Sequence, residues 1–78
     1  MPTALNKSLG LNDVIIKAHN EGDNWNLVSL YTHAANRANS PHLESFFLTQ
    51  AYVFALEQDH PAQRRLKSRL VASATNEK

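Results

Sequence analysis

The densest apolar run of the chain lies in SPHLESFFLTQAYVFALEQD, residues 40–59, which also holds all three phenylalanines. Ser40 suits an N-cap, and Pro41 suits the first helical turn, where its missing N–H costs nothing. No further proline or glycine follows before Pro61. The apolar residues occupy a broad arc of the helix, which is wider than one neighbouring helix would cover. The sequence therefore predicts a central helix with neighbours on more than one side.

The remaining segments also carry helical signals. Two glycines and three prolines in 78 residues favour helix over sheet. Leu11, Val14, Ile15 and Ala18 follow the i, i+3, i+4, i+7 spacing of an amphipathic helix. Asn12 or Asp13 is expected to cap that helix, and Gly22 to end it in left-handed geometry. We expect an all-α fold, a small antiparallel bundle of four helices over about 12–20, 24–38, 41–58 and 60–72.

The same signals define the domain limits. Residues 11–72 are expected to form one helical domain, because short turns join the predicted helices and keep them adjacent. An irregular segment is expected at 1–10 and a disordered, polar tail at 73–78.

Small residues recur at helical spacing in two of the predicted helices. Ala51 and Ala55 are one turn apart in the central helix, and Ala34, Ala35 and Ala38 stand in the preceding one. Because alanine lets another backbone approach closely, we expect these two antiparallel helices to meet at an alanine seam.

The composition excludes several classes of function. The chain has no cysteine, which rules out disulfides, thiol catalysis and cysteine zinc sites. Its net charge of +1 implies no obligatory polyanion partner. No apolar run approaches the roughly 20 residues of a membrane-spanning helix, and the N-terminus lacks the order of a signal peptide. The expectation is a cytoplasmic protein with no membrane partner.

Catalytic, metal and cofactor signals are weak. The four histidines are His19, His33, His42 and His60, and none forms an H-x3-H pair. Zinc would need three or four converging ligands. No nucleophile elbow or phosphate-cradling glycine loop is present. We expect no enzyme, metal or cofactor, although an acid–base pair of His33 with Glu44 or Asp23 stays open.

Aromatic and apolar residues exceed what so small a core can hide. The predicted partner or dimer surface consists of Ile16, Trp25, Leu30, Phe46 and Tyr52. Aromatic residues concentrate at the centres of interfaces, so a protein partner, self or other, is expected. The alternative is that all of them lie inside the core.

Basic residues cluster near the C-terminal end. They are Arg64, Arg65, Lys67 and Arg69. Clustered cations can contact the phosphates of nucleic acid, which gives an alternative function as a small nucleic-acid-associated regulator. The simpler interpretation, which we favour, is a solvated helix face.

Residues Asn24 to Leu70 resemble a tetratricopeptide-type helical hairpin. Leu27 and Tyr31 have the spacing of the first-helix Leu and Tyr in that family, and Tyr52 and Ala55 match its second-helix aromatic and alanine. The segment Ala55-Leu56-Glu57-Gln58-Asp59, followed by a proline, looks like the family's usual helix ending. The resemblance implies a scaffold or partner-binding role and carries over no functional residue.

Overall fold

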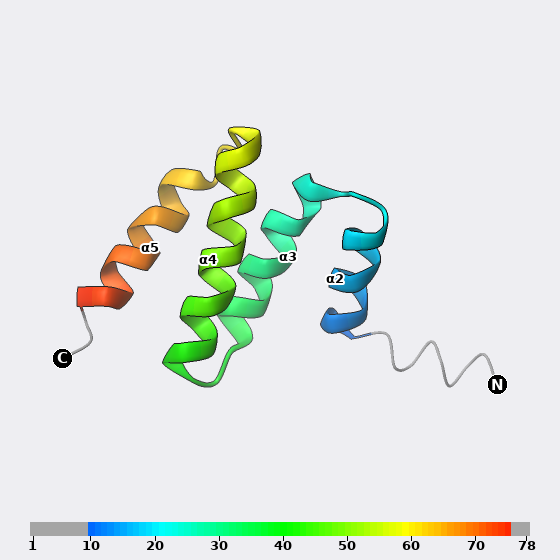
Figure 1. Ribbon diagram of the computed structural model, residues 1–78. Coiled ribbons are helices and arrows are strands. Elements are labelled where there is room, and N and C mark those ends of the chain that lie inside the picture. The colour runs from blue at the N-terminus through cyan, green and yellow to red at the C-terminus, as the bar shows by residue number, and fades with distance from the viewer. Residues whose placement is uncertain (1–9, 76–78) are drawn as a thin grey trace.

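The computed structural model describes residues 10–75, and these residues form four helices without a strand. The helices are α2 (Leu11–Asn20), α3 (Asn24–Arg37), α4 (Pro41–Gln58) and α5 (Gln63–Thr75), shown in Figure 1. The all-α prediction and its four helices are confirmed. The expectations for residues 1–9 and 76–78 lie outside the described part of the chain.

Side-chain caps fix the starts of α3 and α4, and the cap of α4 is the one that the sequence predicts. The carboxylate of Asp23 accepts the backbone N–H of Asn26 at 3.4 Å. The Ser40 hydroxyl accepts the N–H of Leu43 at 3.2 Å, with Pro41 in the first turn. The start of α2 differs from the prediction, because Gly10 is its N-cap and Asp13 accepts the Gly10 N–H. Each of these caps satisfies an amide that the helix itself leaves unpaired.

Two residues with positive φ end α2 and α4. Gly22, just after α2, has φ of 66°, as predicted for a left-handed stop. Asp59 at the C-cap of α4 has φ of 53°. Its side chain accepts a hydrogen bond from Gln63 Nε2 at 3.1 Å, which ties the end of α4 to the start of α5.

The predicted limits of the last helix need a correction. The prediction was 60–72, whereas α5 runs from Gln63 to Thr75. The start is later because His60 lies in the turn and its Nδ1 accepts the Ala62 N–H at 3.0 Å. The helix continues past the predicted start of the tail, and Ser73 Oγ lies 3.4 Å from Ser45 Oγ on α4. The packing of α5 on α4 therefore extends to the last turns of α5.

His60 links this turn to the start of α3. It is the one buried polar residue within 10–75, and its ring lies 4.1 Å from the Trp25 ring, measured between centroids. We expect His60→Ala to lower the free energy of unfolding by about 2 kcal/mol, because it removes both the ring contact and the capping acceptor. Urea unfolding measures this loss. His60→Asn keeps a polar acceptor and should lose less; equal stability of all three proteins would contradict this role.

The helices form a row in chain order. α3 packs against α2 and α4, and α4 packs against α3 and α5; among the described residues no other pair of helices is in backbone contact (Figure 1). The Cα atoms extend over 47 × 28 × 13 Å, so the row is thin in one direction. Most domains bury their apolar faces between two layers of elements. A single layer leaves the outer sides of its helices exposed.

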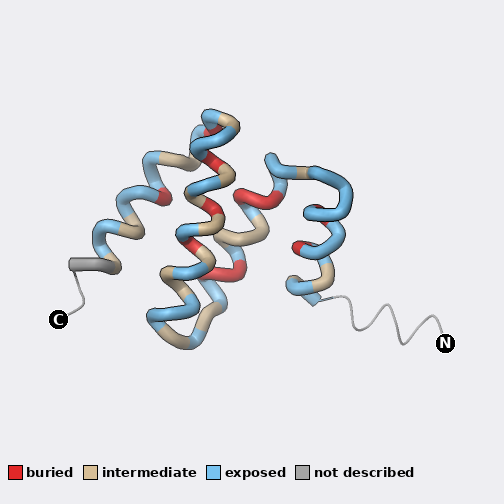
Figure 2. The backbone as a smooth tube through the Cα atoms, viewed as in Figure 1, coloured by how far each residue is buried: buried red, intermediate tan, exposed pale blue. Residues whose placement is uncertain are grey.

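The core consists of two clusters, shown as the buried positions in Figure 2. The first joins α3, α4 and α5 and contains Val28, Ala35, Leu48, Ala51, Ala55 and Leu66. The second joins α2 and α3 and contains Ile15, Ala18, Leu27 and Ala34. Tyr31, Phe47 and Phe54 contact both clusters and bridge them.

The predicted alanine seam is confirmed at three positions. Ala35 of α3 and Ala51 and Ala55 of α4 are at most 2% exposed and share one cluster. Ala34 instead belongs to the cluster with α2, and Ala38 is half-buried. The difference follows from the helical turn, since neighbouring residues point about 100° apart and so serve different partners.

Candidate interaction surface

α4 carries apolar side chains on opposite sides. Leu48, Ala51 and Ala55 are fully buried against α3 and α5. The side turned away from these helices carries the α4 strip, which we define as Leu43, Phe46, Val53 and Leu56, each 43 to 53% exposed. Phe46 and Val53 are two turns apart on one side of the helix, and the other two lie one turn beyond each end. An apolar helix side of this length is typical of a buried helix, but here nothing within residues 10–75 covers it.

A groove continues the strip toward α2. Its volume is about 280 Å³, and its lining includes Leu11, Ile15, Ala34, Leu43 and Phe47 from three helices. The Phe47 ring meets the Phe46 ring edge-on, with centroids 5.4 Å apart. The apolar surface therefore extends from the exposed side of α4 into the junction of α2, α3 and α4.

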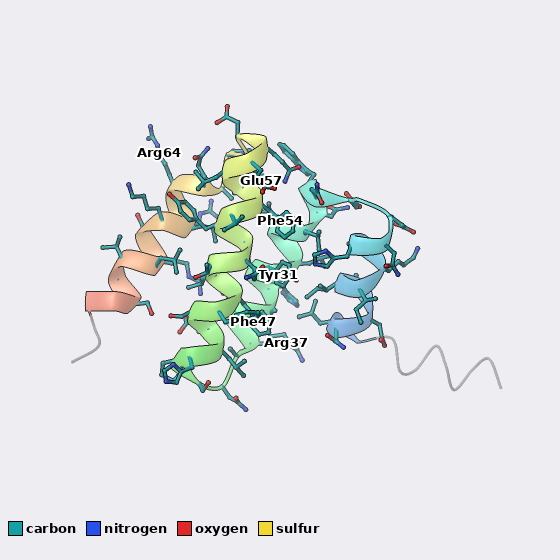
Figure 3. The ribbon with its side chains drawn as sticks, in the orientation of Figure 1. Tyr31, Arg37, Phe47, Phe54, Glu57 and Arg64 are labelled. Atoms are coloured by element: carbon teal, nitrogen blue, oxygen red, sulfur yellow. The ribbon has the colours of Figure 1, made fainter. Side chains whose placement is uncertain are left out.

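Opposite charges stand at the two ends of the strip. Glu57 is exposed near the C-terminal end of α4, and Arg37 is exposed at the end of α3 beside the start of α4. Figure 3 shows both, at opposite ends of α4. Neither side chain forms an ion pair with another described residue. Both charges are therefore available to a partner.

The five predicted surface residues do not form one surface. Ile16, Trp25 and Phe46 are 50 to 53% exposed, whereas Leu30 and Tyr52 are half-buried against the two core clusters. Trp25 packs on His60 at the C-terminal end of α4, and Phe46 lies near the opposite end of that helix. Ile16 belongs to α2, which has no backbone contact with α4. Only Phe46 lies on the α4 strip.

Sequence reasoning missed Leu43, Val53 and Leu56. Their signal was present as the i, i+3, i+10, i+13 spacing with Phe46, which keeps all four near one side of a helix. Of this side, the prediction placed only Phe46 at the surface, because it expected neighbouring helices on more than one side of the central helix.

Tyr31 and His19 lie where α2, α3 and α4 meet. His19 Nε2 and the Tyr31 hydroxyl lie 2.9 Å apart in a hydrogen bond. The Tyr31 ring stacks on Phe54 with an interplanar angle of 9° and centroids 6.1 Å apart. Burial raises the pKa of the Tyr31 phenol, because the charged phenolate loses hydration there.

The raised pKa of Tyr31 predicts a loss of stability at high pH. The unfolded chain gives up this proton first, near the ordinary value of 10.0, so the folded state is favoured less as the pH rises above 10. Urea unfolding between pH 8 and 11 in steps of about one unit should show this fall in the wild type. Tyr31→Phe removes the titrating group, so its unfolding free energy should fall less steeply. Parallel pH curves for the two proteins would contradict this.

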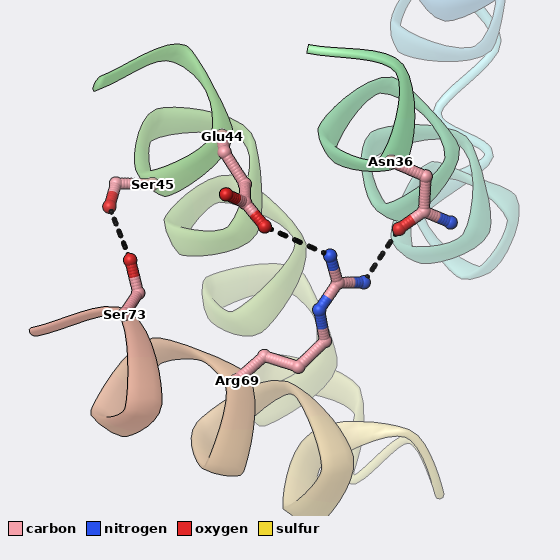
Figure 4. A network of polar contacts seen from close by, with 5 residues as sticks. All are labelled: Asn36, Glu44, Ser45, Arg69 and Ser73. Carbon is pink, nitrogen blue, oxygen red and sulfur yellow. Dashed lines mark hydrogen bonds and ion pairs between the residues drawn. The ribbon is translucent and has the colours of Figure 1, made fainter. Parts of the chain in front are cut away.

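The four basic residues of the C-terminal region separate into two kinds. Arg69 holds α5 to its neighbours: its Nη1 donates to Asn36 Oδ1 at 2.8 Å, and its Nη2 pairs with Glu44 Oε2 at 3.3 Å (Figure 4). Arg64, Arg65 and Lys67 are exposed, and two of them line an open groove of about 490 Å³ with Tyr52. A nucleic-acid role stays a prediction, which salt-sensitive retardation of mixed DNA or RNA in a gel would test.

His33 does not form an acid–base pair with Glu44 or Asp23, the two partners that the sequence left open. Glu44 pairs with Arg69, and Asp23 caps α3, while His33 is exposed. In the part of the chain that the structure describes, no three His, Asp or Glu side chains are placed to hold a metal ion. Likewise, none of the helices within 10–75 has the length and apolar character needed to cross a bilayer.

Comparisons of the chain with models of protein families, with curated proteins and with solved structures found no match. The four helices packed on their neighbours in chain order, and the exposed apolar strip on α4, are thus the basis for a functional proposal.

Proposed function

We propose that the protein is a small helical interaction module without chemistry of its own, which associates with protein, foremost with itself, through the α4 strip. The observation that supports this is the half-exposed apolar strip on a helix whose opposite side is fully buried. Covering the exposed half of one such side chain stabilises a complex by about 1 kcal/mol. The strip and its groove together supply several such contacts.

The size of the chain also supports association. A domain of 78 residues buries only about 60% of its unfolded surface and is marginally stable alone. A partner that binds the folded form adds stability by mass action. Both gains favour a dimer over an isolated layer.

The arrangement also fits the scaffold role that a tetratricopeptide-like hairpin implies. In such proteins each helical unit contacts only its neighbours, and the row presents a broad binding surface. The proposal places the protein in the cytoplasm, because a cysteine-free chain suits a reducing compartment.

The test replaces strip residues and measures self-association by dilution calorimetry. Phe46→Ser and Val53→Ser should each raise the dissociation constant about tenfold or more, because each removes apolar contact at the centre of the strip. Ile16→Ser is the matched control: Ile16 is 50% exposed, as Phe46 is 53%, but it lies on α2. An Ile16→Ser effect equal to that of Phe46→Ser would contradict the proposal.

A further inference from the structure

We propose that the α4 strip binds the same strip of a second copy, packed antiparallel. The two-fold axis passes through the pair at Gln50, and Arg37 of each copy lies beside Glu57 of the other. This arrangement rests on the proposed function and specifies its partner and its geometry. It is built from three observations: a seam along α4, charges at its ends, and the extent of the exposed face.

The seam follows from residue spacing. Leu43, Phe46, Gln50, Val53 and Glu57 repeat at intervals of three and four, which is the spacing by which two helices pair side by side. They cover about 21 Å of helix at 1.5 Å per residue. Gln50 is the middle member. A two-fold axis at Gln50 therefore brings the apolar residues of one strip against those of the other.

Gln50 suits the position on the axis. It is half-buried, and its amide makes no hydrogen bond to another residue within 10–75. An amide carries both donors and an acceptor, so two Gln50 side chains facing each other can bond reciprocally. A single polar residue in an apolar seam fixes the register of two paired helices.

The charges select the antiparallel orientation. An antiparallel pair places Glu57 of each copy near Arg37 and near the N-terminal end of α4 of the other, where the helix dipole is positive. A parallel pair would place like charges together at both ends, which costs stability and excludes that orientation. Because the strip is complementary to itself under a two-fold rotation, the assembly closes at two copies.

The exposed face is large enough for a stable dimer. A standard interface takes about 800 Å² from each partner. The Cα atoms of the row extend over 47 by 28 Å in its two long directions, which encloses more than this area. Two rows placed face to face would form the two-layered arrangement that a single row lacks.

Single cysteines test the geometry without interference, because the chain has none of its own. Gln50→Cys lies on the axis, where the two sulfurs can meet, and should form a covalent dimer with oxidised glutathione. Leu43→Cys should not link to itself, since its copies lie at opposite ends of the seam. A mixture of Leu43→Cys and Glu57→Cys should give the mixed dimer.

The possible outcomes separate the two proposals. A wild-type chain that never associates overturns the proposed function and the dimer geometry with it. A dimer in which Leu43→Cys links to itself is parallel, which overturns the geometry and leaves the proposed function standing. A dimer in which none of the three variants forms a link uses a surface other than the α4 seam, and this also overturns the geometry.

Charge reversal provides an independent check of the pairing. Glu57→Arg and Arg37→Glu should each raise the dissociation constant about tenfold, because each creates two repulsive contacts across the axis. The double variant restores opposite charges and should return to within about threefold of the wild type. Arg64→Glu, a charge reversal on α5, should have no effect. Failure of the double variant to recover would overturn the Arg37–Glu57 pairing.

Discussion

Leu48→Ala should lower the free energy of unfolding by about 3 to 4 kcal/mol, which is a large part of the total stability of a chain this size. Leu48 is fully buried at the junction of α3, α4 and α5. Truncating it removes the transfer free energy of the side chain and leaves a cavity between three helices. Urea unfolding followed by circular dichroism measures the loss.

The matched control for Leu48→Ala is Leu56→Ala on the same helix. Leu56 belongs to the exposed strip and is 49% exposed. In a dilute sample, where the chain is monomeric, its truncation should change the unfolding free energy by less than about 0.5 kcal/mol. Equal losses for the two substitutions would show that α4 does not have the buried and exposed sides described above.

Ala51→Leu should destabilise the protein by about 3 kcal/mol, although leucine is the more hydrophobic residue. Ala51 is fully buried in the alanine seam, where it shares a cluster with Ala35 of α3. The larger side chain would force the two helices apart, because packed interiors have no room for added methylene groups. Thermal unfolding measures this effect as a lower melting temperature.

Ala51→Ser provides the control for volume, since it adds a single oxygen atom. It should cost clearly less than leucine, because its hydroxyl can bond a carbonyl of the preceding turn. A stabilising effect of Ala51→Leu would mean that α3 and α4 are not in close contact at this seam.

The fold could be predicted because its determinants are local. Asp23 and Ser40 cap the helices that follow them, and Gly22 occupies the left-handed position expected after α2. The predicted start of α5 was wrong, because the hydrogen bond from the Ala62 N–H to the His60 ring depends on how the turn folds. Spacing in the sequence does not show which atom will accept that hydrogen bond.

The sequence predicted that apolar residues would be exposed, but it did not identify most of the residues that form the α4 strip. Counting apolar residues correctly indicated an excess over the core, and Phe46 lies in the exposed strip. Trp25, however, packs on His60, which lies 35 positions away in the chain, and Tyr52 packs toward the α4–α5 core. Which side of α4 stays exposed depends on where α3 and α5 pack. Because α4 carries apolar residues on opposite sides, its periodicity alone does not show which side these helices cover.

The basic residues show the same limit. Arg69 resembles Arg65 in the sequence, but only Arg69 reaches both Asn36 and Glu44. These partners stand 33 and 25 residues away, so the interaction arises from the packing of α5 across the hairpin. Its role in holding the helices together could not be inferred from the charge pattern.

The central claim is that a single row of helices leaves one side of α4 for a second copy to cover. Sedimentation equilibrium of the wild-type chain, from micromolar to millimolar concentration, tests it most directly. The account predicts a mass that rises to that of two chains of 8.7 kDa and goes no higher. A mass of one chain at every concentration would contradict it.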